Sequence, residues 1–239
     1  MSLDNYYCTK HAIAYIDLLG IKEEIKDDQD QCLKNMAKAL FFANEVRKRG
    51  TSFKFFEKMK TKAFSDNIIF AIEITAEIDT ETALTGVILA AYFFQRMLIQ
   101  ECRYLSRGAI TVGDLYIDDD VVWGKGLVRA YQLENDIAIF PRVIIDSEIL
   151  PELNLDSLSE QNKTLLLCNI KSDFDKNFYV DFSNMSNEES EKFMADLMDT
   201  CMRRYKINDK VIQKISWLEQ MAERLQKKID AKHEQKIEE

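Results

Sequence analysis

Apolar residues along this chain fall into short runs and into helical spacings, and the two patterns predict where strands and helices lie. Residues 10–19 (KHAIAYIDLL) form a run of strand length, apolar on both faces over 12–16, and Gly20 ends it. Spacings of three and four predict helices at 21–49, 78–104 and 126–135. Further strands are predicted at 52–59, 63–74, 107–123, 143–146, 164–169 and 178–181.

This order of elements indicates an α+β fold. A strand, a helix, two strands, a helix and a strand in succession are typical of a ferredoxin-like core, and we expect a mostly antiparallel sheet with helices on one face. Within 107–123, the turn is predicted either at Gly113 or at the acidic run 118–120.

After Asp181 the composition changes, and a helical extension is predicted. Ser186-Asn-Glu-Glu is typical of a helix start, and that helix is expected to run to about 204. A last helix over 208–232 carries apolar residues seven apart: Val211, Leu218 and Leu225, and Ile215, Ala222 and Ile229. This seam favours docking on the chain's own domain or a coiled coil with another subunit. We therefore predict a domain over 1–182 and a helical extension over 183–239, whose end frays.

Composition excludes several classes of protein. The chain has 32 Lys and Arg against 41 Asp and Glu, a net charge of −9, so it lacks the basic surface of a nucleic-acid binder. No apolar stretch reaches the ~18 residues of a membrane span, and the first residues show no signal-peptide pattern. Five scattered cysteines, none at metal-ligand spacing, indicate reduced thiols in a cytoplasmic protein. The two histidines, His11 and His233, exclude a His-rich zinc site.

Two aspartates interrupt apolar strands. Asp17 ends the first strand, before Leu18-Leu19-Gly20 and a helix, and Asp66 lies within AFSDNIIF. A carboxylate in an apolar strand is costly unless a cation, hydrogen bonds or a metal compensates it. If only one of the two aspartates were present, a role in capping a helix or forming a turn would be enough to explain it. Together, on two strands of one sheet, they favour a site for two Mg²⁺ or Mn²⁺ ions, beside a helix start whose N–H groups suit a triphosphate.

Around these aspartates the chain resembles the class III nucleotidyl cyclases. Tyr15-Ile-Asp17-Leu-Leu-Gly20 is similar to their F-x-D-I-x-G-F signature, and Phe64-Ser-Asp66-Asn to their second metal aspartate. Two later segments resemble R-x-G-(I/V)-x-x-G and V-W-G-x-x-V-N-x-A-x-R-x-E: Arg107-Gly-Ala-Ile-Thr-Val-Gly113 and Trp123-Gly-Lys-Gly-Leu-Val-Arg-Ala-Tyr-Gln-Leu-Glu134. The order holds over about 10–182, which implies a class III cyclase-like fold.

The chain departs from this family at the transition-state residues. The family's Asn falls at Val128 and its Arg at Gln132, so we expect Arg129 or Lys125 to supply the catalytic cation.

The resemblance also suggests which residues contact the base. It places the base-reading Lys at Lys62, or at Lys60-Thr61 in a looser alignment, and the base-reading Asp within 118–120, with Asp120 as the candidate. Solvated surface charge is the competing interpretation of Lys62, Arg129 and the acidic run.

The chain is most similar to the bacterial pyrimidine cyclases of the Pycsar antiphage systems. This resemblance implies that UTP is converted to cyclic UMP, or CTP to cyclic CMP, and that the product activates a separate effector protein. It implies that Asp17, Asp66 and the Leu18 carbonyl hold two divalent cations (Mn²⁺ or Mg²⁺), that Leu18, Leu19 and Gly20 contact the nucleotide, and that the enzyme is a homodimer. A cation at Lys62 favours UTP and acids at 118–120 favour CTP; we favour UTP.

Two alternatives remain open. The missing Asn and Arg favour a cyclase-like module that binds a nucleotide or pairs with another chain without turnover. A further two-metal enzyme, such as a diguanylate cyclase or a polymerase relative, is disfavoured because a G-G-D-E-F turn is absent.

Overall fold

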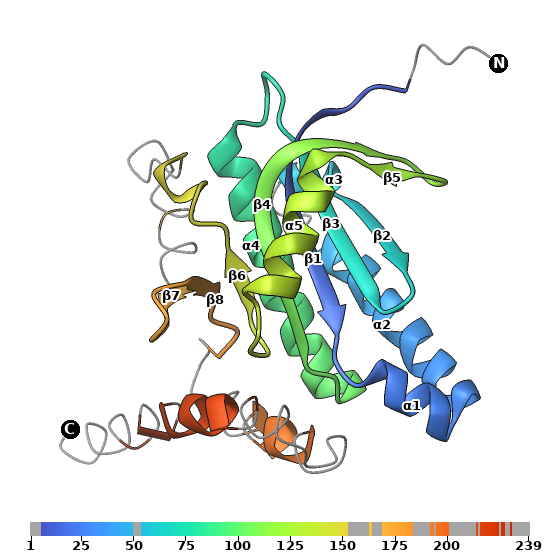
Figure 1. Cartoon of the computed structure of the whole chain (residues 1–239), viewed down its shortest axis with the longest axis vertical. Helices are drawn as coiled ribbons and strands as arrows, with labels where there is room; N and C mark the ends of the chain where they lie inside the picture. The colour runs from blue at the N-terminus through green and yellow to red at the C-terminus, as the bar shows by residue number, and fades with distance from the viewer. Residues whose placement is uncertain are drawn as a thin grey trace.

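The computed structural model describes residues 6–49, 54–152, 163, 169–183, 192, 193, 195–200, 214, 216–224, 226, 227 and 230. Figure 1 shows how the elements are arranged around one sheet. The described strands are β1 (Thr9–Leu18), β2 (Lys60–Phe64), β3 (Asn67–Glu73), β4 (Ser106–Ile117), β5 (Val122–Trp123), β6 (Val143–Ile145), β7 (Ile170–Ser172) and β8 (Phe178–Val180). The described helices are α1 (Ile21–Asp27), α2 (Gln29–Arg49), α3 (Lys54–Glu57), α4 (Thr80–Met97), the π-helix Leu98–Cys102, α5 (Lys125–Asp136) and the 3₁₀ turn Leu150–Glu152.

The predicted α+β class is confirmed. The sheet has the order β2-β3-β1-β4-β6-β8-β7, with β5 paired to β4. Each described strand pair is antiparallel except β4 with β6. The strands β2-β3-β1-β4, with α1 and α2 before β2 and α4 before β4, form the predicted ferredoxin-like core.

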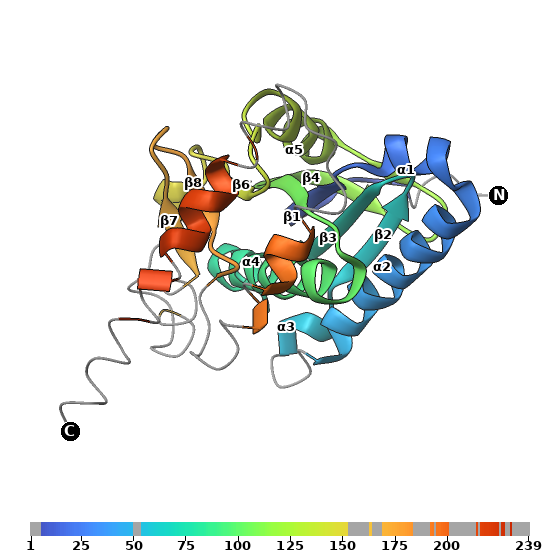
Figure 2. The same ribbon diagram turned by 90° about the horizontal axis from the view of Figure 1, so that it is seen from below.

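Helices cover both faces of this sheet. The even-numbered residues of β1, Ala12, Ala14 and Ile16, pack in the core with α2 and α4, while Ile13 and Tyr15 pack on the opposite face under α5. Figure 2 shows α4, α2 and α3 on one side and α5 on the other. The two longest helices thus share one face, as predicted, and α5 is the exception. It is required because β1 is apolar on both faces and each face must be buried.

Two local strand predictions are corrected by the structure, and a third lies almost entirely outside the described residues. The run predicted as a strand at 52–59 contains the helix α3, because Phe55, Phe56 and Met59 are all buried and their spacing fits a helix. The run 63–74 divides into β2 and β3 at a tight turn in which Ser65 has a φ of 53°. Of the strand predicted at 164–169, residues 164–168 lie outside the described residues, and the next described strand, β7, begins at Ile170.

Two other elements end or break at polar residues. The helix predicted over 21–49 is interrupted at Asp28, whose carboxylate accepts a hydrogen bond from the amide of Gln31 at 3.0 Å and begins α2. The hairpin predicted within 107–123 turns at the acidic run and not at Gly113, since β4 continues to Ile117.

The helix α4 is long and strongly apolar. By length and composition, the helical stretch Thr80–Cys102 meets the requirement for a membrane span, but 83% of its most apolar window is buried inside the fold. Its apolar surface is therefore covered by the protein itself, as in a core helix.

The described part of the C-terminal extension packs on the rest of the chain. Phe193, Leu197, Trp217, Leu218 and Met221 are buried in the same core as the sheet and α4. Docking on its own domain, one of the two predicted arrangements, is thus observed for this part. Of the predicted apolar seam, only Leu218 and Ala222 fall within the described residues. The helix start at Ser186 and residues 231–239 of the predicted frayed end lie outside them, and the domain boundary at 182 stays a prediction.

Close packing of α5 on the sheet depends on two glycines. A Cβ atom added at Gly113 of β4 would lie 2.7 Å from Cα and 3.1 Å from N of Gly126, in the first turn of α5. Both of these are backbone atoms, so the helix itself would have to move. Because α5 carries residues of the pocket described below, this contact sets the position of one wall of that pocket.

We expect Gly113→Ala to lower the free energy of unfolding by about 1–3 kcal/mol, the usual cost of overpacking. Urea denaturation measures this change. Gln132→Ala, at an exposed position of α5, serves as the control and should shift stability by less than about 0.5 kcal/mol. Equal stability of Gly113→Ala and the wild type would show that the contact is not a constraint.

Candidate active site

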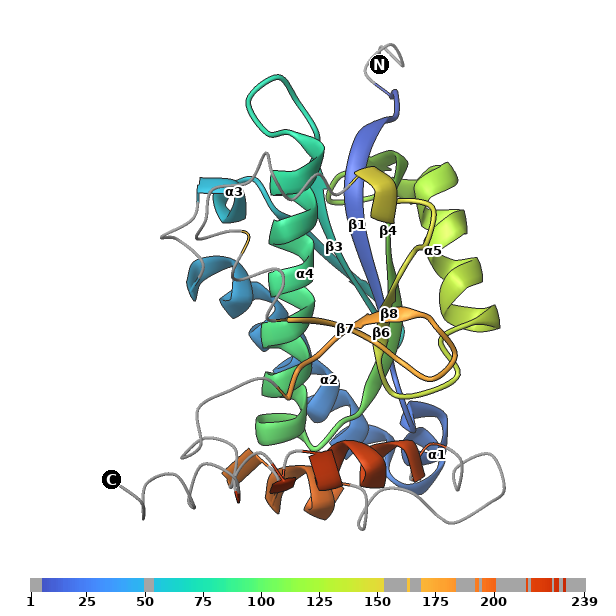
Figure 3. The ribbon, with the colours of Figure 1, turned by 90° about the vertical axis from the view of Figure 1, so that its left-hand side faces the viewer.

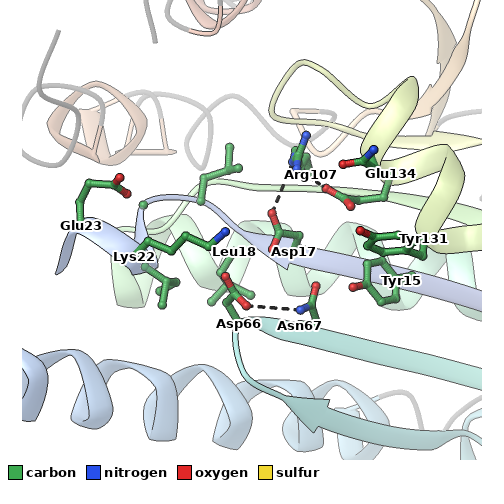
Figure 4. A pocket seen from close by; sticks show the side chains of 14 residues that line it. Tyr15, Asp17, Leu18, Lys22, Glu23, Asp66, Asn67, Arg107, Tyr131 and Glu134 are labelled. Atoms are coloured by element: carbon green, nitrogen blue, oxygen red, sulfur yellow. Dashed lines mark hydrogen bonds and ion pairs between the residues drawn. The ribbon is translucent and has the colours of Figure 1, made fainter. Parts of the chain in front are cut away.

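A pocket of about 280 Å³ opens where β1 ends and the β2–β3 hairpin turns. Its lining comes from three regions: Tyr15 and residues 17–23 at the end of β1 and the start of α1, Asp66 and Asn67 of the hairpin, and Arg107, Tyr131, Glu134 and Asn135 from β4 and α5. Asp17, Leu18, Leu19, Gly20 and Asp66, all predicted from the sequence, therefore line one pocket (Figure 4).

Strand pairing places the two aspartates side by side. Asp17 is the register partner of Asn67 in β3, and the Leu18 amide donates to the Asp66 carbonyl at 3.0 Å. The Asn67 side-chain amide donates to the Asp66 carboxylate at 3.3 Å. Burial raises the pKa of Asp17, and the negative charge of Asp66 raises it further. The pair therefore concentrates negative charge that a cation would stabilise.

Arg107 is the cation that faces this pair from β4. Its Nε lies 3.4 Å from the Asp17 carboxylate and its Nη2 lies 2.6 Å from that of Glu134. Burial raises the pKa of Glu134 to about 7, with Arg107 opposing the rise and Asp17 and Asp66 adding to it. Sequence reasoning did not propose Arg107 or Glu134 as site residues. The sequence marks both residues as charged members of the segments 107–113 and 123–134, but their approach to Asp17 follows from the strand register, which only the structure shows.

Aromatic side chains form the wall opposite the turn. The rings of Tyr15 and Tyr131 meet edge to face with centroids 6.2 Å apart, and Tyr15 also lies 6.4 Å from Phe64. Tyr131 and Phe64 remain about half exposed. The wall thus offers ring surface against which a planar base can stack.

The turn at 18–20 needs a glycine, since Gly20 has a φ of 89°. The amides of Leu18 and Leu19 donate to the carbonyls of Asp66 and Leu105, so these two groups hold the turn and do not bind phosphate. Of the amides predicted to bind phosphate, only those of the first turn of α1 therefore remain candidates, because their N–H groups have no carbonyl partner within the helix. Figure 4 shows the Lys22 side chain extending from this turn toward the two aspartates.

The donor atoms fit a hard divalent cation. Among the described residues, no group of three or more His, Cys, Asp or Glu side chains could hold a metal ion. The pocket instead supplies two carboxylates and a main-chain carbonyl, a partial set of oxygen ligands that Mg²⁺ or Mn²⁺ completes with water and substrate phosphate. Asp17, Asp66 and the Leu18 carbonyl are the atoms that would hold such ions.

The predicted base-reading residues lie together but outside this pocket. The Lys62 ammonium donates to the carbonyl of Asp118 at 3.2 Å and to that of Asp119. The Asp118 carboxylate accepts from the amides of Asp120 and Val121 at 2.8 and 2.6 Å. Lys62 thus contacts the β4–β5 turn that contains Asp120, and neither residue lines the pocket of its own chain.

The two predicted catalytic cations on α5 also lie outside the pocket. Arg129 donates two hydrogen bonds to Asp146, at 2.9 and 2.8 Å, and one to Glu148 at 2.8 Å. Lys125, the first residue of α5, is exposed, as are Val128 and Gln132. Arg129 is therefore held by carboxylates of its own chain, whereas Lys125 has an exposed side chain.

Comparisons with known proteins find similarity among solved structures only. No protein-family model matches the chain, and no curated protein matches it. Among solved structures, the crystal structure of the guanylyl cyclase Cya2 is similar, with a TM-score of 0.46 and 12% sequence identity. That similarity covers 62% of this chain and 79% of the other.

We expect Arg129→Gln to lower the free energy of unfolding at pH 7 by about 1–3 kcal/mol, because it leaves the buried Asp146 carboxylate without its charged donor. Burial alone would raise the pKa of Asp146, but hydrogen bonds from Arg129 and Thr111 outweigh it and hold the pKa below its usual value.

The pH dependence of this loss follows from the sign of the shift. A carboxylate with a lowered pKa adds stability above its unfolded pKa of about 4, and this stability disappears as the pH falls through the folded value. We therefore expect the free energies of unfolding of Arg129→Gln and the wild type, measured by urea denaturation between pH 7 and pH 2.5, to become more alike as the pH falls. A difference that stays constant with pH would contradict this interpretation of the pair.

Proposed function

We propose that this chain is a nucleotidyl cyclase that converts a pyrimidine nucleoside triphosphate, UTP in preference to CTP, to its 3′,5′-cyclic monophosphate and pyrophosphate. The observation that carries the proposal is the joint position of Asp17 and Asp66 beside the turn at 18–20, in one pocket with Arg107 and Lys22. Carboxylates that hold cations, next to basic side chains that bind phosphate, are what phosphoryl transfer from a triphosphate requires.

Each part of the pocket has a role in this reaction. Divalent cations bound at Asp17, Asp66 and the Leu18 carbonyl would favour ionisation of the ribose 3′-hydroxyl and neutralise phosphate charge. Arg107 and Lys22 bind the phosphates and stabilise the negative charge that develops as pyrophosphate leaves. Tyr131 and Tyr15 hold the nucleoside so that the 3′-oxygen faces the α-phosphorus in line with the departing oxygen. His11 lies on β1 and does not line the pocket, so it is not the base.

We further propose that the enzyme is a homodimer in which a second copy completes the site. Lys62, Asp120 and Lys125 lie outside the pocket of their own chain, so each would reach a bound nucleotide only from another subunit. The surface around β5 and α5 carries exposed apolar side chains, Trp123, Val128 and Tyr131, which supports a contact there. Lys125 is the better candidate for the partner's cation, because Arg129 is already bound by Asp146 and Glu148.

The contacts of Lys62 favour uracil over cytosine. An ammonium has three N–H donors, and the two acceptors found for Lys62 leave one donor for an acceptor such as O4 of uracil. The Asp118 carboxylate, which could accept from N4 of cytosine, is bound instead by the Tyr116 hydroxyl at 2.5 Å and by two amides of its turn.

The resemblance to the Pycsar cyclases supports a cellular role. We propose that the enzyme acts in the cytoplasm in defence against phage, and that its cyclic product binds and activates a separate effector protein. Neither a nucleic acid nor a membrane is part of this proposal.

One observation favours a second function. Val128 and Gln132 stand where cyclases carry their transition-state Asn and Arg, and both are exposed on α5. A chain that keeps Asp17 and Asp66 but lacks the transition-state Asn and Arg would bind a nucleotide, or pair with another chain, without turnover.

A product assay separates these functions. Purified protein incubated separately with ATP, GTP, CTP and UTP, in Mn²⁺, should give cyclic UMP from UTP, identified by chromatography and mass. Asp17→Asn and Asp66→Asn should each lower turnover at least about 10³-fold, because each removes a charged ligand. Asp136→Asn, at the exposed end of α5, is the matched control and should retain activity.

The outcomes of this assay are distinct. Cyclic CMP as the main product would replace UTP by CTP, and cyclic AMP or GMP would overturn the pyrimidine assignment. No cyclic product from a folded protein would favour the module that binds without turnover. Near wild-type activity of either Asp variant would refute the site.

We expect that replacing Arg107 weakens the stabilisation of the transition state. Arg107→Gln should lower kcat/KM about 10²–10³-fold, and Arg107→Lys should restore part of it, because a lysine keeps the charge but not the two-pronged geometry. Steady-state kinetics with UTP measure both variants, with the unfolding midpoint as the control for folding. Equal activity of Arg107→Gln and the wild type would remove Arg107 from the reaction.

A further inference from the structure

The segment Arg103-Tyr104-Leu105 joins the π-helix after α4 to the start of β4. Each of its three residues contacts a different part of the chain: the C-terminal extension, the helix α1 and the turn at 18–20. The last two of these parts line the pocket. The segment therefore connects the extension to the pocket.

Arg103 binds the extension. Its guanidinium pairs with the Asp196 carboxylate at 2.6 Å and with the Asp199 carboxylate at 3.2 Å. Figure 3 shows the extension segment 195–200, in orange, below the lower end of α4. This segment is thus held by charge where α4 and its π-helix end.

The backbone of Arg103 is strained and is fixed by these contacts. Its φ is 57°, in the left-handed region that residues other than glycine rarely adopt. The same guanidinium donates to the carbonyls of Ile99 and Gln100 at 3.0 and 2.7 Å. A strained conformation persists where the surrounding contacts require it. The pairs with the extension therefore help to set the direction in which the chain enters Tyr104.

Tyr104 holds α1. The tyrosine is fully buried, and its hydroxyl donates to the Glu24 carboxylate at 2.5 Å. The other oxygen of that carboxylate accepts from the Asn35 side chain of α2 at 2.7 Å. Glu24 follows Lys22 and Glu23, which line the pocket. The position of Lys22 beside the two aspartates thus depends on a hydrogen bond from the core.

Leu105 holds the turn. Its carbonyl accepts from the Leu19 amide at 2.9 Å, and the next residue, Ser106, pairs with Leu18 in the sheet. Leu18 and Leu19 both line the pocket. A shift of this segment would therefore move the turn and α1 together.

We propose that Arg103 and Tyr104 are positioning residues, through which the docked C-terminal extension fixes the polyphosphate-binding wall of the pocket. Neither residue lines the pocket, so both act through Lys22 and the turn at 18–20. The inference rests on the proposed function as to the nucleotide, but the chemistry that it names, a polyphosphate anion with a divalent cation, is tested separately.

Binding of inorganic tripolyphosphate to the full chain, measured by calorimetry in Mg²⁺, tests the proposal. Asp196→Asn combined with Asp199→Asn should weaken binding about three- to tenfold, the usual range for residues that act on a site from a distance. The sign of this change is informative. Loss of two negative charges by itself favours binding of an anion, so weaker binding reports a change of position and not of net charge.

Two further variants complete the design. Glu219→Gln combined with Glu223→Gln removes the same charge from exposed positions of the last helix, and this control should bind at least as tightly as the wild type. Tyr104→Phe removes only the hydroxyl and should also weaken binding. Added to the two Asn substitutions, it should weaken binding by less than about a further twofold, because both changes act through one segment.

Each variant is first compared with the wild type by its unfolding midpoint. A merely structural role of these contacts would lower the midpoint and leave the affinity of the folded chain unchanged. If the two Asn substitutions prevent folding, Tyr104→Phe alone decides, because it keeps the buried ring.

The outcomes separate this proposal from the proposed function. Weaker binding by the two Asn substitutions and by Tyr104→Phe supports it even if no cyclic nucleotide is formed in the product assay. Unchanged or tighter binding by either variant overturns it, as does a lack of binding by the wild type, even if cyclic UMP is formed. Fully additive losses, or equal weakening in the Glu219 and Glu223 control, would also overturn it.

Discussion

The central strand β1 is apolar on both faces, and the rest of the structure follows from the need to bury both. One face requires α2 and α4, and the other requires α5, which approaches the sheet so closely that Gly113 and Gly126 meet at backbone distance. Burial on both sides also leaves no water near the middle of the strand. Asp17, the acidic residue of β1, therefore lies at the end of the strand, where the cover ends and the pocket opens.

Negative charge is concentrated at this pocket at a cost to stability. Because burial raises the pKa of Glu134 to about 7, above its unfolded value, the folded protein without ligands loses stability as the pH rises from about 4.5 to 7. The same sign holds for Asp17, whose pKa is also raised. Sites that keep buried like charges together are frequently functional, since a bound cation or ligand removes the repulsion. Elsewhere the chain pairs its buried charges, as Arg142 does with Asp173 and Asp175.

The described part of the C-terminal extension joins segments that lie far apart in the sequence. Trp217 contacts Asp173 and Phe140, and Arg103, at the end of the π-helix, pairs with Asp196. The apolar residues of the extension, among them Phe193, Leu197 and Trp217, belong to the same core as the sheet and α4. The extension is therefore part of the folded body and not an appendage to it.

Local pattern was sufficient for most of the elements and for the two aspartates of the site. The apolar run of β1, the spacing in α4 and α5, and the costly position of Asp17 and Asp66 in apolar strands can all be read along the chain. The α+β class follows from their order. Adjacent buried aromatics were misleading at Phe55 and Phe56, because a short apolar run fits a strand or a helix until its packing is known.

Only the tertiary structure decided which charges meet. Register pairs Asp17 with Arg107 across β1 and β4, helix packing brings Glu134 to the same arginine, and folding separates Arg129 and Lys62 from the pocket by giving them partners of their own. The sequence marks each of these residues as charged, but the energy of a charge depends on distance and burial. Those quantities are set by contacts between segments far apart along the chain, and no local pattern contains them.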